Sequence, residues 1–301
     1  MKVGVVILPE HRWPEARALW RRVEELGFDS AWTYDHLTWR TLRDRPWFAA
    51  VPTLAAAALA TERIRLGPLV ASITFRHPVP FAKELMTLDD LSGGRLTLGI
   101  GAGGLGHDAA ALGGEPWSAR ERSQRFAEFV GLLDRVLREP ATTARGRWYS
   151  AEQARSIPGC VQRPRLPFAV AAHGPRALRV AARFGDAWVT TASPPGSPGA
   201  TTEQCAAYVR DRARSLDEAC AALGRDPRTI ERMVLLGTGA DRPLASVDAF
   251  VDCAGRYAEI GIDELVVPHP RATEPYAGDP SVLERIALEA LPGLRVARPA
   301  G

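Results

Sequence analysis

The chain has 301 residues, of which 46% are hydrophobic and 24% are charged, and such values are typical of a globular enzyme. Its formal net charge of +3 is too small for a protein that binds nucleic acid or a membrane surface through charge. No apolar run reaches the roughly eighteen residues of a membrane span, so we expect a protein without a membrane or nucleic-acid partner.

Apolar runs and helical periodicities alternate along the chain. Eight segments are typical of buried strands: 3–8, 28–34, 64–73, 95–101, 167–172, 186–191, 229–238 and 262–267. Each precedes a segment with apolar residues at helical spacing: 13–26, 51–61, 79–91, 118–138, 175–184, 202–223, 246–260 and 280–290. Eight such units in one chain of uniform composition predict an α/β fold, a single (β/α)₈ barrel domain over residues 1–301. Segment 139–166, between the fourth helix and the fifth strand, lacks periodicity and is predicted to be an excursion from the barrel.

The cysteines and the N-terminus indicate the cellular compartment. None of the four cysteines belongs to a CxxC pair, so the sequence shows neither a zinc nor a redox motif. The N-terminal apolar run is shorter than the core of a signal peptide. We therefore expect a reduced, cytoplasmic protein, and no spacing of ligands supports a metal site.

The histidines follow a pattern that points to the active-site face. All six fall after a predicted strand: His11, His36, His77, His107, His173 and His269. Active sites of (β/α)₈ barrels lie on the face formed by these loops. Because imidazole suits proton transfer and anion contacts near neutral pH, the pattern favours an enzyme with a polar or anionic ligand. The alternative for one or two of them is a helix cap.

The strongest local signal is the loop after the second strand, which opens with Asp35 and His36 and continues to Trp39. A carboxylate beside a histidine can orient the imidazole or keep it protonated. The indole offers a wall for a flat ligand. The alternative is that Asp35 caps a helix and Trp39 packs within the loop.

Two glycine-containing loops are candidates for ligand contact. The stretch GIGAGG at 99–104 matches G-x-G-x-x-G, but it follows the fourth strand, whereas the dinucleotide fingerprint belongs to a first strand–helix–strand unit. We interpret Gly101 and Gly103 as allowing close approach of a ligand, with a tight turn as the alternative. At 173–176, the sequence HGPR begins a helix with Gly and Pro and adds an arginine, which predicts a phosphate site; an ordinary helix start is the alternative.

These residues together resemble the luciferase-like monooxygenase superfamily over nearly the whole chain. The matching stretches are ELGFDSAWTYDH (25–36), RIRLGPLVASITFRHP (63–78), LDDLSGGRLTLGIGAG (88–103) and GRWYSAEQARSIPGCVQRPRLPFAVAAHGPRALRVAARFGDAWV (146–189). The resemblance implies a (β/α)₈ barrel, usually a homodimer, that holds a flavin or the deazaflavin coenzyme F420. The Asp-His pair is similar to the F420-dependent branch, in which the acid and the histidine face the reactive ring and a tryptophan flanks the substrate.

The resemblance also implies roles for individual residues. Asp35 and His36 are expected to be catalytic, with Asp35 also near the cofactor, and Trp39 to contact the substrate. The branch usually has a Glu shortly after the fourth strand, as a proton donor or substrate contact. This chain has none there, so His107 and Asp108 are the candidate replacements and are expected to contact the substrate. The family's non-proline cis peptide is expected at Ser72–Ile73, with Ile73 against the ring. The remaining expected cofactor contacts are Ser72, Thr74, Gly101 and Gly103 near the ring, and His173, Gly174, Pro175 and Arg176 at its phosphate.

The resulting hypothesis is that the protein is an F420-dependent oxidoreductase that transfers a hydride. In its more specific form, the enzyme reduces a C=C or C=N bond of a small biosynthetic substrate. One alternative is a monooxygenase that uses reduced FMN. The other is a non-catalytic cofactor-binding member of the family, which the missing Glu motivates. The substrate pocket is expected in loops 39–48, 104–117, 192–201 and 268–280, whose aromatic residues favour an apolar or aromatic ligand.

Overall fold

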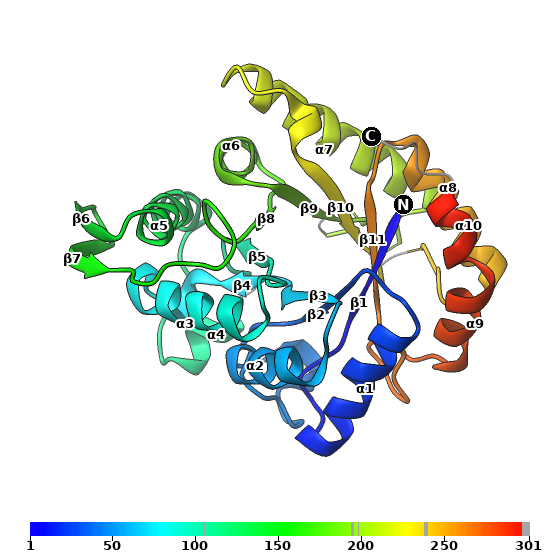
Figure 1. Cartoon of the computed structure of the whole chain (residues 1–301). Coiled ribbons are helices and arrows are strands. Elements are labelled where there is room, and N and C mark those ends of the chain that lie inside the picture. The colour runs from blue at the N-terminus through cyan, green and yellow to red at the C-terminus, as the bar shows by residue number, and fades with distance from the viewer. Residues whose placement is uncertain (105, 194–195, 198, 238–239, 297–301) are drawn as a thin grey trace.

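Parallel strands form a cylinder that is surrounded by helices in the computed structural model, which describes residues 1–104, 106–193, 196–197, 199–237 and 240–296 (Figure 1). The strand order is β3-β2-β1-β11-β10-β9-β8-β5-β4. Its two end strands, β3 (Arg65–Pro68) and β4 (Ala71–Ser72), are consecutive pieces of one strand, so the sheet closes on itself. The predicted (β/α)₈ barrel is therefore confirmed.

The barrel strands coincide with the eight predicted apolar runs. Besides β3 and β4 they are β1 (Lys2–Val6), β2 (Ser30–Thr33), β5 (Leu98–Gly101), β8 (Phe168–Ala171), β9 (Ala187–Thr191), β10 (Glu231–Leu235) and β11 (Glu264–Pro268). The helices that follow them are α1 (Trp13–Glu25), α2 (Ala50–Ala60), α3 (Pro78–Leu91), α5 (Ala119–Arg138), α6 (Pro175–Phe184), α7 (Thr202–Ala221), α8 (Val247–Glu259) and α9 (Ser281–Glu289). The short α10 (Leu291–Val296) follows α9 and contacts β1.

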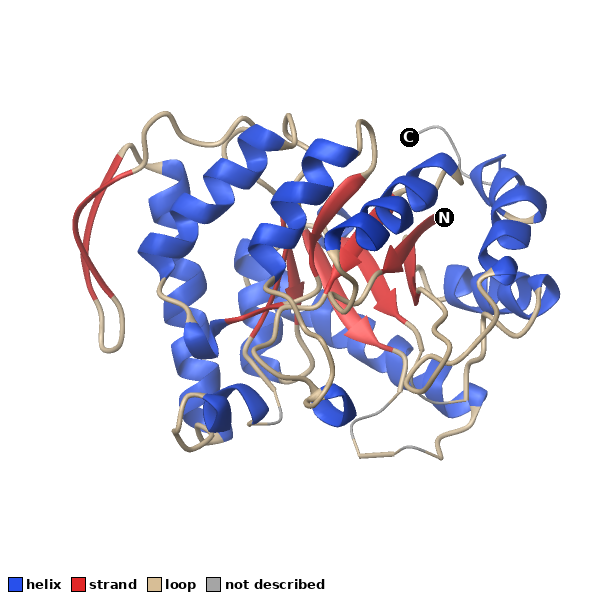
Figure 2. Ribbon diagram, turned by 90° about the horizontal axis from the view of Figure 1, so that it is seen from below, coloured by secondary structure: helices blue, strands red, loops and turns tan. Residues whose placement is uncertain are grey.

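Three kinds of element in the described part of the chain lie outside the regular alternation. The predicted excursion is confirmed as an antiparallel hairpin of β6 (Ala141–Arg145) and β7 (Ser150–Arg155), which projects away from the barrel beside α5 (Figure 2). The short helix α4 (His107–Ala111) precedes α5 and was not predicted. Three 3₁₀ turns are η1 (Arg40–Leu42), η2 (Ile73–Phe75) and η3 (Pro227–Thr229).

The core explains why the strands are apolar without alternation. Strands of a closed parallel barrel are covered by helices outside and filled by side chains inside, so both faces are buried. At the amino-terminal ends of the strands, Ser30, Trp32 and Glu264 fill the barrel interior, next to Gly4. A Cβ atom at position 4 would lie 2.2 Å from Oγ of Ser30 and 2.8 Å from Oε1 of Glu264, so this position requires glycine.

None of the helices in the described part of the chain combines the length and the apolar character needed to cross a membrane.

Candidate functional site

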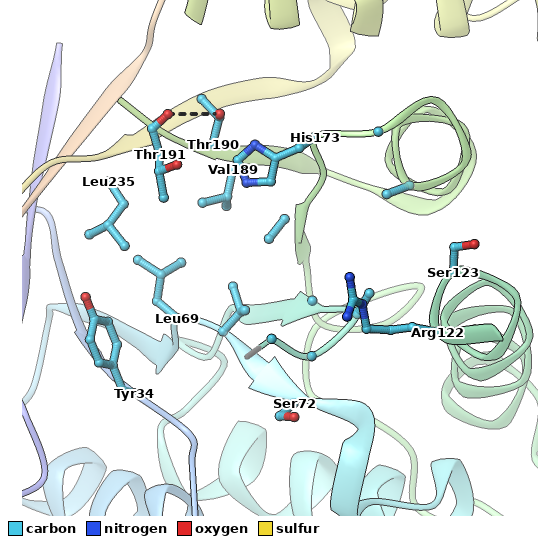
Figure 3. A pocket seen from close by; sticks show the side chains of 18 of the residues that line it. Tyr34, Leu69, Ser72, Arg122, Ser123, His173, Val189, Thr190, Thr191 and Leu235 are labelled. Carbon is cyan, nitrogen blue, oxygen red and sulfur yellow. Dashed lines mark hydrogen bonds between the residues drawn. The ribbon is translucent and has the colours of Figure 1, made fainter. Parts of the chain in front are cut away.

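A cavity of about 810 Å³ lies at the carboxyl ends of the barrel strands. Its volume is within the range of small-molecule and cofactor sites. Apolar and small side chains from four strand ends form its floor: Leu69, Val70, Ala171, Val189 and Leu235. Figure 3 shows Leu69, Val189 and Leu235 around this space, with Tyr34 on one side and Arg122 and Ser123 on the other. Such a floor suits a flat apolar ring.

Three arginines on α5 and α6 form one side of the cavity, and we call Arg122, Arg176 and Arg179 the arginine face. Among the described residues, none of the three forms an ion pair. Arg176 makes only a long contact, from Nη1 to Oγ of Ser123 at 3.5 Å. Unpaired guanidinium groups at a cavity wall provide bidentate donors for phosphate or carboxylate.

The start of α6 adds backbone donors to the arginine face. Gly174 is the N-cap of α6, Pro175 occupies the first helical turn, and no side chain caps this end. The first N–H groups of a helix lack intrahelical acceptors, and the helix dipole favours an anion beside them. His173, Gly174, Pro175 and Arg176 all line the cavity, so the predicted phosphate site has the required donors together. A Cβ atom on Gly174 would meet no protein atom within 4 Å, so this backbone is open toward a ligand.

His173 is held in its neutral form by its surroundings. Burial, assisted by the charge of Arg212, lowers the pKa of His173. Its Nδ1 atom lies 2.8 Å from the hydroxyl of Tyr208, whose pKa is raised by burial. A neutral imidazole at this position offers hydrogen bonds to a ligand without adding a further positive charge to the three of the arginine face.

His36 lines the cavity, and the acid that pairs with it, Asp108, comes from a distant part of the sequence. Its Nδ1 atom lies 2.9 Å from Oδ2 of Asp108, and Oδ1 of Asp108 accepts the backbone N–H of Leu37 at 2.8 Å. Burial acts to raise the pKa of Asp108, but the hydrogen bonds from His36 and the backbone outweigh it and leave this pKa below its ordinary value. Asp108 is therefore a carboxylate at neutral pH, and Nδ1 of His36 donates to it.

The helix α4 brings Asp108 to His36. Its N-cap, Gly106, has a φ of +84°, a conformation that favours glycine. The turn places Asp108 in the first turn of α4, where it is 5% exposed and does not line the cavity itself. Asp108 was expected to contact the substrate; the structure places it behind His36 instead. His107, the other candidate, begins α4 and also does not line the cavity.

Asp35 was expected to face a cofactor ring, but its carboxylate points to Arg76 instead. Its carboxylate is buried and accepts two hydrogen bonds from Arg76, at 2.9 and 2.8 Å, and a third from the backbone of Ser72 at 3.3 Å. Arg76 also bonds Glu84 at 2.8 Å. The carboxylate of Asp35 therefore does not line the cavity; it joins the loop after β2 to the end of β4.

The non-proline cis peptide was predicted at the wrong bond. It lies between Leu69 and Val70, where β3 passes into β4, rather than at Ser72–Ile73. Val70 lines the cavity, whereas Ile73 is 1% exposed and packs in the hydrophobic core. Ile73 is thus not placed to contact a ring.

Of the other residues predicted to lie near the cofactor ring, some line the cavity and one does not. Ser72 lines the cavity, and its hydroxyl bonds that of Thr74 at 3.1 Å, while Thr74 itself does not line the cavity. Gly101 and Gly103 both line it. Gly103 has a φ of +80°, and a Cβ atom there would lie 2.6 Å from Oγ1 of Thr74, so the close approach it permits is to Thr74.

An aromatic wall of Tyr34, Trp39 and Tyr276 closes the cavity opposite the arginine face. Trp39 packs at 5.1 Å from Tyr34 and at 6.1 Å from Tyr276, measured between ring centroids, and the two phenol oxygens lie 2.9 Å apart. Trp47 stacks on the far side of Trp39 and donates to the carbonyl of His36. Trp39 thus lies where a substrate contact was expected.

Several cavity residues were not predicted, and most lacked a local signal. Arg122 and Ser123 belong to α5, whose helical pattern gives no sign that one end faces the cavity. Arg179 lies one helical turn after Arg176, a spacing from which a second cation on the same face is predictable. Tyr34 directly precedes Asp35 and continues the strand pattern, so only the barrel geometry identifies it.

The predicted substrate loops contribute unequally. Trp39, Arg40, Gly104 and Tyr276 line the cavity. In loop 192–201, residues 194, 195 and 198 lie outside the described part of the chain, and the described residues of that loop do not line the cavity. The predicted histidine pattern holds, because all six follow barrel strands, but only His36 and His173 line the cavity. His77 is a helix cap, accepting the N–H of Val79 at 3.3 Å.

Comparisons with known proteins identify the family of this chain. The model of the luciferase-like monooxygenase family matches residues 1–238. An F420-dependent glucose-6-phosphate dehydrogenase from Beutenbergia cavernae is 35% identical over 317 aligned positions, which cover 90% of each chain. A 4-hydroxyprotoasukamycin monooxygenase from Streptomyces nodosus subsp. asukaensis is 32% identical and covers 84% of this chain and 68% of its own.

Solved structures show the same fold. A coenzyme F420-dependent tetrahydromethanopterin reductase from Methanopyrus kandleri superposes with a TM-score of 0.78 at 17% identity, covering 97% of this chain and 99% of its own. An F420-dependent secondary alcohol dehydrogenase, solved with an F420-acetone adduct, gives 0.79 at 18% identity, covering 98% and 99%. At these identities the likeness is one of fold.

Proposed function

This chain belongs to the luciferase-like monooxygenase family, and on that premise we propose that it is an oxidoreductase that uses coenzyme F420 to exchange a hydride with a small organic substrate. The observation that carries the proposal is that His36, backed by Asp108, lines the same cavity as the unpaired arginine face. Relatives named as a dehydrogenase and a monooxygenase support an enzyme over a non-catalytic family member.

The residues present fit this coenzyme. F420 joins a flat deazaflavin ring to a tail that bears phosphate and carboxylate groups. Leu69, Val70 and Ala171 would form the floor under the ring, and the arginine face and the start of α6 would bind the tail. None of the described residues that line the cavity is Asp or Glu, so no lining carboxylate repels such a tail. When bound, F420 supplies or accepts a hydride at its ring.

His36 and Asp108 supply the proton chemistry that hydride exchange requires. With Nδ1 engaged by Asp108, the nitrogen of His36 that can exchange a proton with a ligand is Nε2. The Asp108 carboxylate fixes the ring orientation and stabilises the imidazolium form, as an acid does behind a catalytic histidine. Asp35 acts at a distance, holding Ser72 and the end of β4 in place.

The more specific form of the proposal is the reduction of a C=C or C=N bond. Such a reduction adds one hydride and one proton, and protonated His36 can provide the proton. An anaerobic assay with chemically reduced F420 and a panel of unsaturated carbonyl compounds and imines tests it. A matched panel of alcohols and glucose 6-phosphate with oxidised F420 tests the opposite direction. Turnover only in the second panel would overturn the reductive direction and leave the coenzyme assignment intact.

A second candidate is an FMN-dependent monooxygenase, which the 32% identity to a monooxygenase over 84% of the chain favours. Titration of the cofactor-free protein with F420 and with FMN, followed by tryptophan fluorescence, separates the two. Trp39 lines the cavity and provides the signal. We expect quenching by F420 at lower concentration than by FMN. Tight binding of FMN without binding of F420 would reverse this ranking.

The role of His36 has its own test. Replacing His36 with Ala leaves the apolar floor and the arginine face intact, so F420 affinity is expected to stay near the wild-type value. Turnover is expected to fall by about two to four orders of magnitude, the usual contribution of a general acid–base group. Wild-type turnover in His36→Ala would contradict this role. His11→Ala is the matched control, because His11 follows a strand but does not line the cavity.

A further inference from the structure

The charges that line the cavity are positive at both ends. Besides the arginine face, one further arginine, Arg40, belongs to the described lining, and it lies with the aromatic wall. In the proposed function the arginine face binds the coenzyme tail. The cation at the other end therefore has no role in holding the coenzyme.

Local packing directs Arg40 toward the aromatic wall. Arg40 begins the turn η1 with a φ of +45°, and its Cζ atom lies 5.2 Å from the ring centroid of Trp39. Burial raises the pKa of Tyr34 and of Tyr276, and the positive charge of Arg40 opposes this rise at both phenols. Arg40 thus packs against the indole of Trp39 and lines the same cavity as the two phenols.

Arg40 has no carboxylate partner in the described part of the chain. Asp44, four residues further along the chain, pairs with Arg43 at 3.8 Å. Acidic residues that follow β1, β2 and β5 are also engaged elsewhere, each at hydrogen-bond distance from its own partner. Glu10 accepts from Arg271 at 2.6 Å, Asp35 from Arg76 at 2.8 Å, and Asp108 pairs with His36 at 2.9 Å. An unpaired guanidinium beside a ligand cavity is a site for an anion supplied by the ligand.

The phenol pair adds a neutral donor to this end. The hydroxyl oxygens of Tyr34 and Tyr276 are 2.9 Å apart, so one phenol donates to the other and the second O–H is left to donate to a ligand. Both phenols remain protonated at neutral pH because burial raises their pKa. Arg40, this free O–H and the part of Trp39 that lines the cavity together offer charge, a hydrogen bond and an apolar surface.

We propose that the aromatic wall and Arg40 form a subsite for an anionic group of the substrate, a carboxylate or a phosphate attached to a flat or apolar body. This inference rests on the proposed function, which assigns the arginine face to the coenzyme. It narrows the substrate class from small organic molecules to organic anions. Arg40 then orients the substrate by its charged end, while the reacting bond lies toward the floor and His36.

The test uses F420-loaded protein and isothermal titration calorimetry with three probes: benzoate, phenyl phosphate and the neutral isostere benzamide. Wild-type protein is expected to bind at least one of the anions more tightly than benzamide, with an affinity that falls as salt is added. In Arg40→Gln the Kd for that anion is expected to rise about tenfold to a hundredfold, the usual effect of losing a charged hydrogen-bond partner. Arg40→Lys is expected to restore part of the affinity.

Arg45→Gln is the matched control, because Arg45 is an exposed residue of the same loop that does not line the cavity, and it is expected to bind as wild type does. Thermal unfolding of each variant confirms that the loop change has not unfolded the barrel. Equal binding of benzamide and both anions by wild type, no binding of either anion, or unchanged anion affinity in Arg40→Gln would each overturn the subsite. Whichever anion binds more tightly identifies the substrate's charged group.

Failure of the proposed function gives a different result. If F420 does not bind the wild-type protein, the coenzyme assignment fails, and the same probes titrated into cofactor-free protein still decide whether Arg40 binds an anion. If F420 binds and the anions do not, the coenzyme assignment stands and the subsite fails.

Discussion

The Nδ1 atom of His36 lies 2.9 Å from Oδ2 of Asp108, so the acid that supports the cavity histidine comes from α4, between β5 and α5, rather than from Asp35 beside it. The backbone N–H of Leu37 donates to the second oxygen of Asp108 and fixes the carboxylate. This arrangement gives the site an oriented imidazole, while none of the described residues that line the cavity is Asp or Glu.

Replacing Asp108 with Asn tests this pairing. The amide retains the size of the side chain but removes the charge that stabilises the imidazolium of His36. We expect kcat to fall, by no more than the roughly 10²–10⁴-fold that acid–base catalysis by His36 itself contributes. F420 affinity is expected to be unchanged, because Asp108 does not line the cavity. The exposed Asp90 on α3, replaced by Asn, is the control, and equal kcat values in the two variants would contradict the pairing.

The buried pair of Asp35 and Arg76 predicts a different phenotype. Asp35 is 3% exposed and accepts two of the hydrogen bonds of Arg76, so Asp35→Asn leaves this largely buried cation with only Glu84 as a counter-charge. We expect the free energy of unfolding to fall by about 3 kcal/mol, the lower end for breaking a buried pair, since the amide keeps one acceptor. Urea denaturation measures the loss.

The control for this prediction is the exposed pair of Arg43 and Asp44, in which Asp44→Asn is expected to change stability by less than about 0.5 kcal/mol. The same experiment tests the catalytic role that the family resemblance implied for Asp35. Lost turnover at wild-type stability would show that this carboxylate acts on the coenzyme rather than on the end of β4.

The arginine face predicts charge-dependent binding of the coenzyme. Arg176→Gln removes a cation that has no ion pair in the described part of the chain, so its loss leaves no other group unpaired. We expect the Kd for F420 to rise about tenfold or more, and the salt dependence of binding to weaken. Arg183→Gln, on the same helix but outside the cavity, is expected to bind F420 as wild type does. Equal affinities for the two variants would remove the arginine face from the coenzyme site.

The barrel was predictable from the sequence because its signal is local. Each strand is an apolar run and each helix has its own periodicity, as in β8 (Phe168–Ala171) and α6 (Pro175–Phe184). The grouping of donors at the start of α6 was predictable for the same reason, since Gly174 and Arg176 are adjacent to the helix start, while phosphate binding there stays a prediction. The resemblance to a family added the expectation of a cofactor, which no spacing in this chain specifies.

The unpredicted features depend on contacts between distant segments. Asp35 is adjacent to His36 in the sequence, whereas Asp108 is far along the chain. Only the fold shows that Asp35 bonds Arg76 and that Asp108 bonds His36. The cis peptide was misplaced by three residues, because its position depends on how β3 meets β4. Arg122 lines the cavity because the first turns of α5 border it, as Ala119 and Ser123 also do, and helical periodicity does not report which end of a helix borders a cavity.

At the opposite end of the barrel from the cavity, Glu264 is a buried carboxyl group that the proposed chemistry does not use. Ser30 donates to its Oε1 atom, and the indole of Trp32 donates to the Ser30 hydroxyl at 2.7 Å. Burial, together with the charge of Glu231, raises the pKa of Glu264 to about 7, and the hydrogen bond from Ser30 opposes only part of this rise. Glu264 therefore holds its proton in the folded state at mildly acidic pH.

A raised carboxyl pKa makes the protein less stable as the pH rises. Between the ordinary pKa of 4.5 and the folded value of about 7, the unfolded chain has released the proton that the folded chain keeps, so the free energy of unfolding falls across this window. The difference amounts to roughly 3 kcal/mol and is fully developed above about pH 7. Glu264→Gln cannot ionise, so its stability relative to wild type is expected to increase by that amount between pH 4.5 and pH 8. Urea denaturation at both pH values, with the exposed Glu259→Gln on α8 as the pH-independent control, measures it. A constant difference between Glu264→Gln and wild type at the two pH values would mean that Glu264 ionises alike in the folded and unfolded chain.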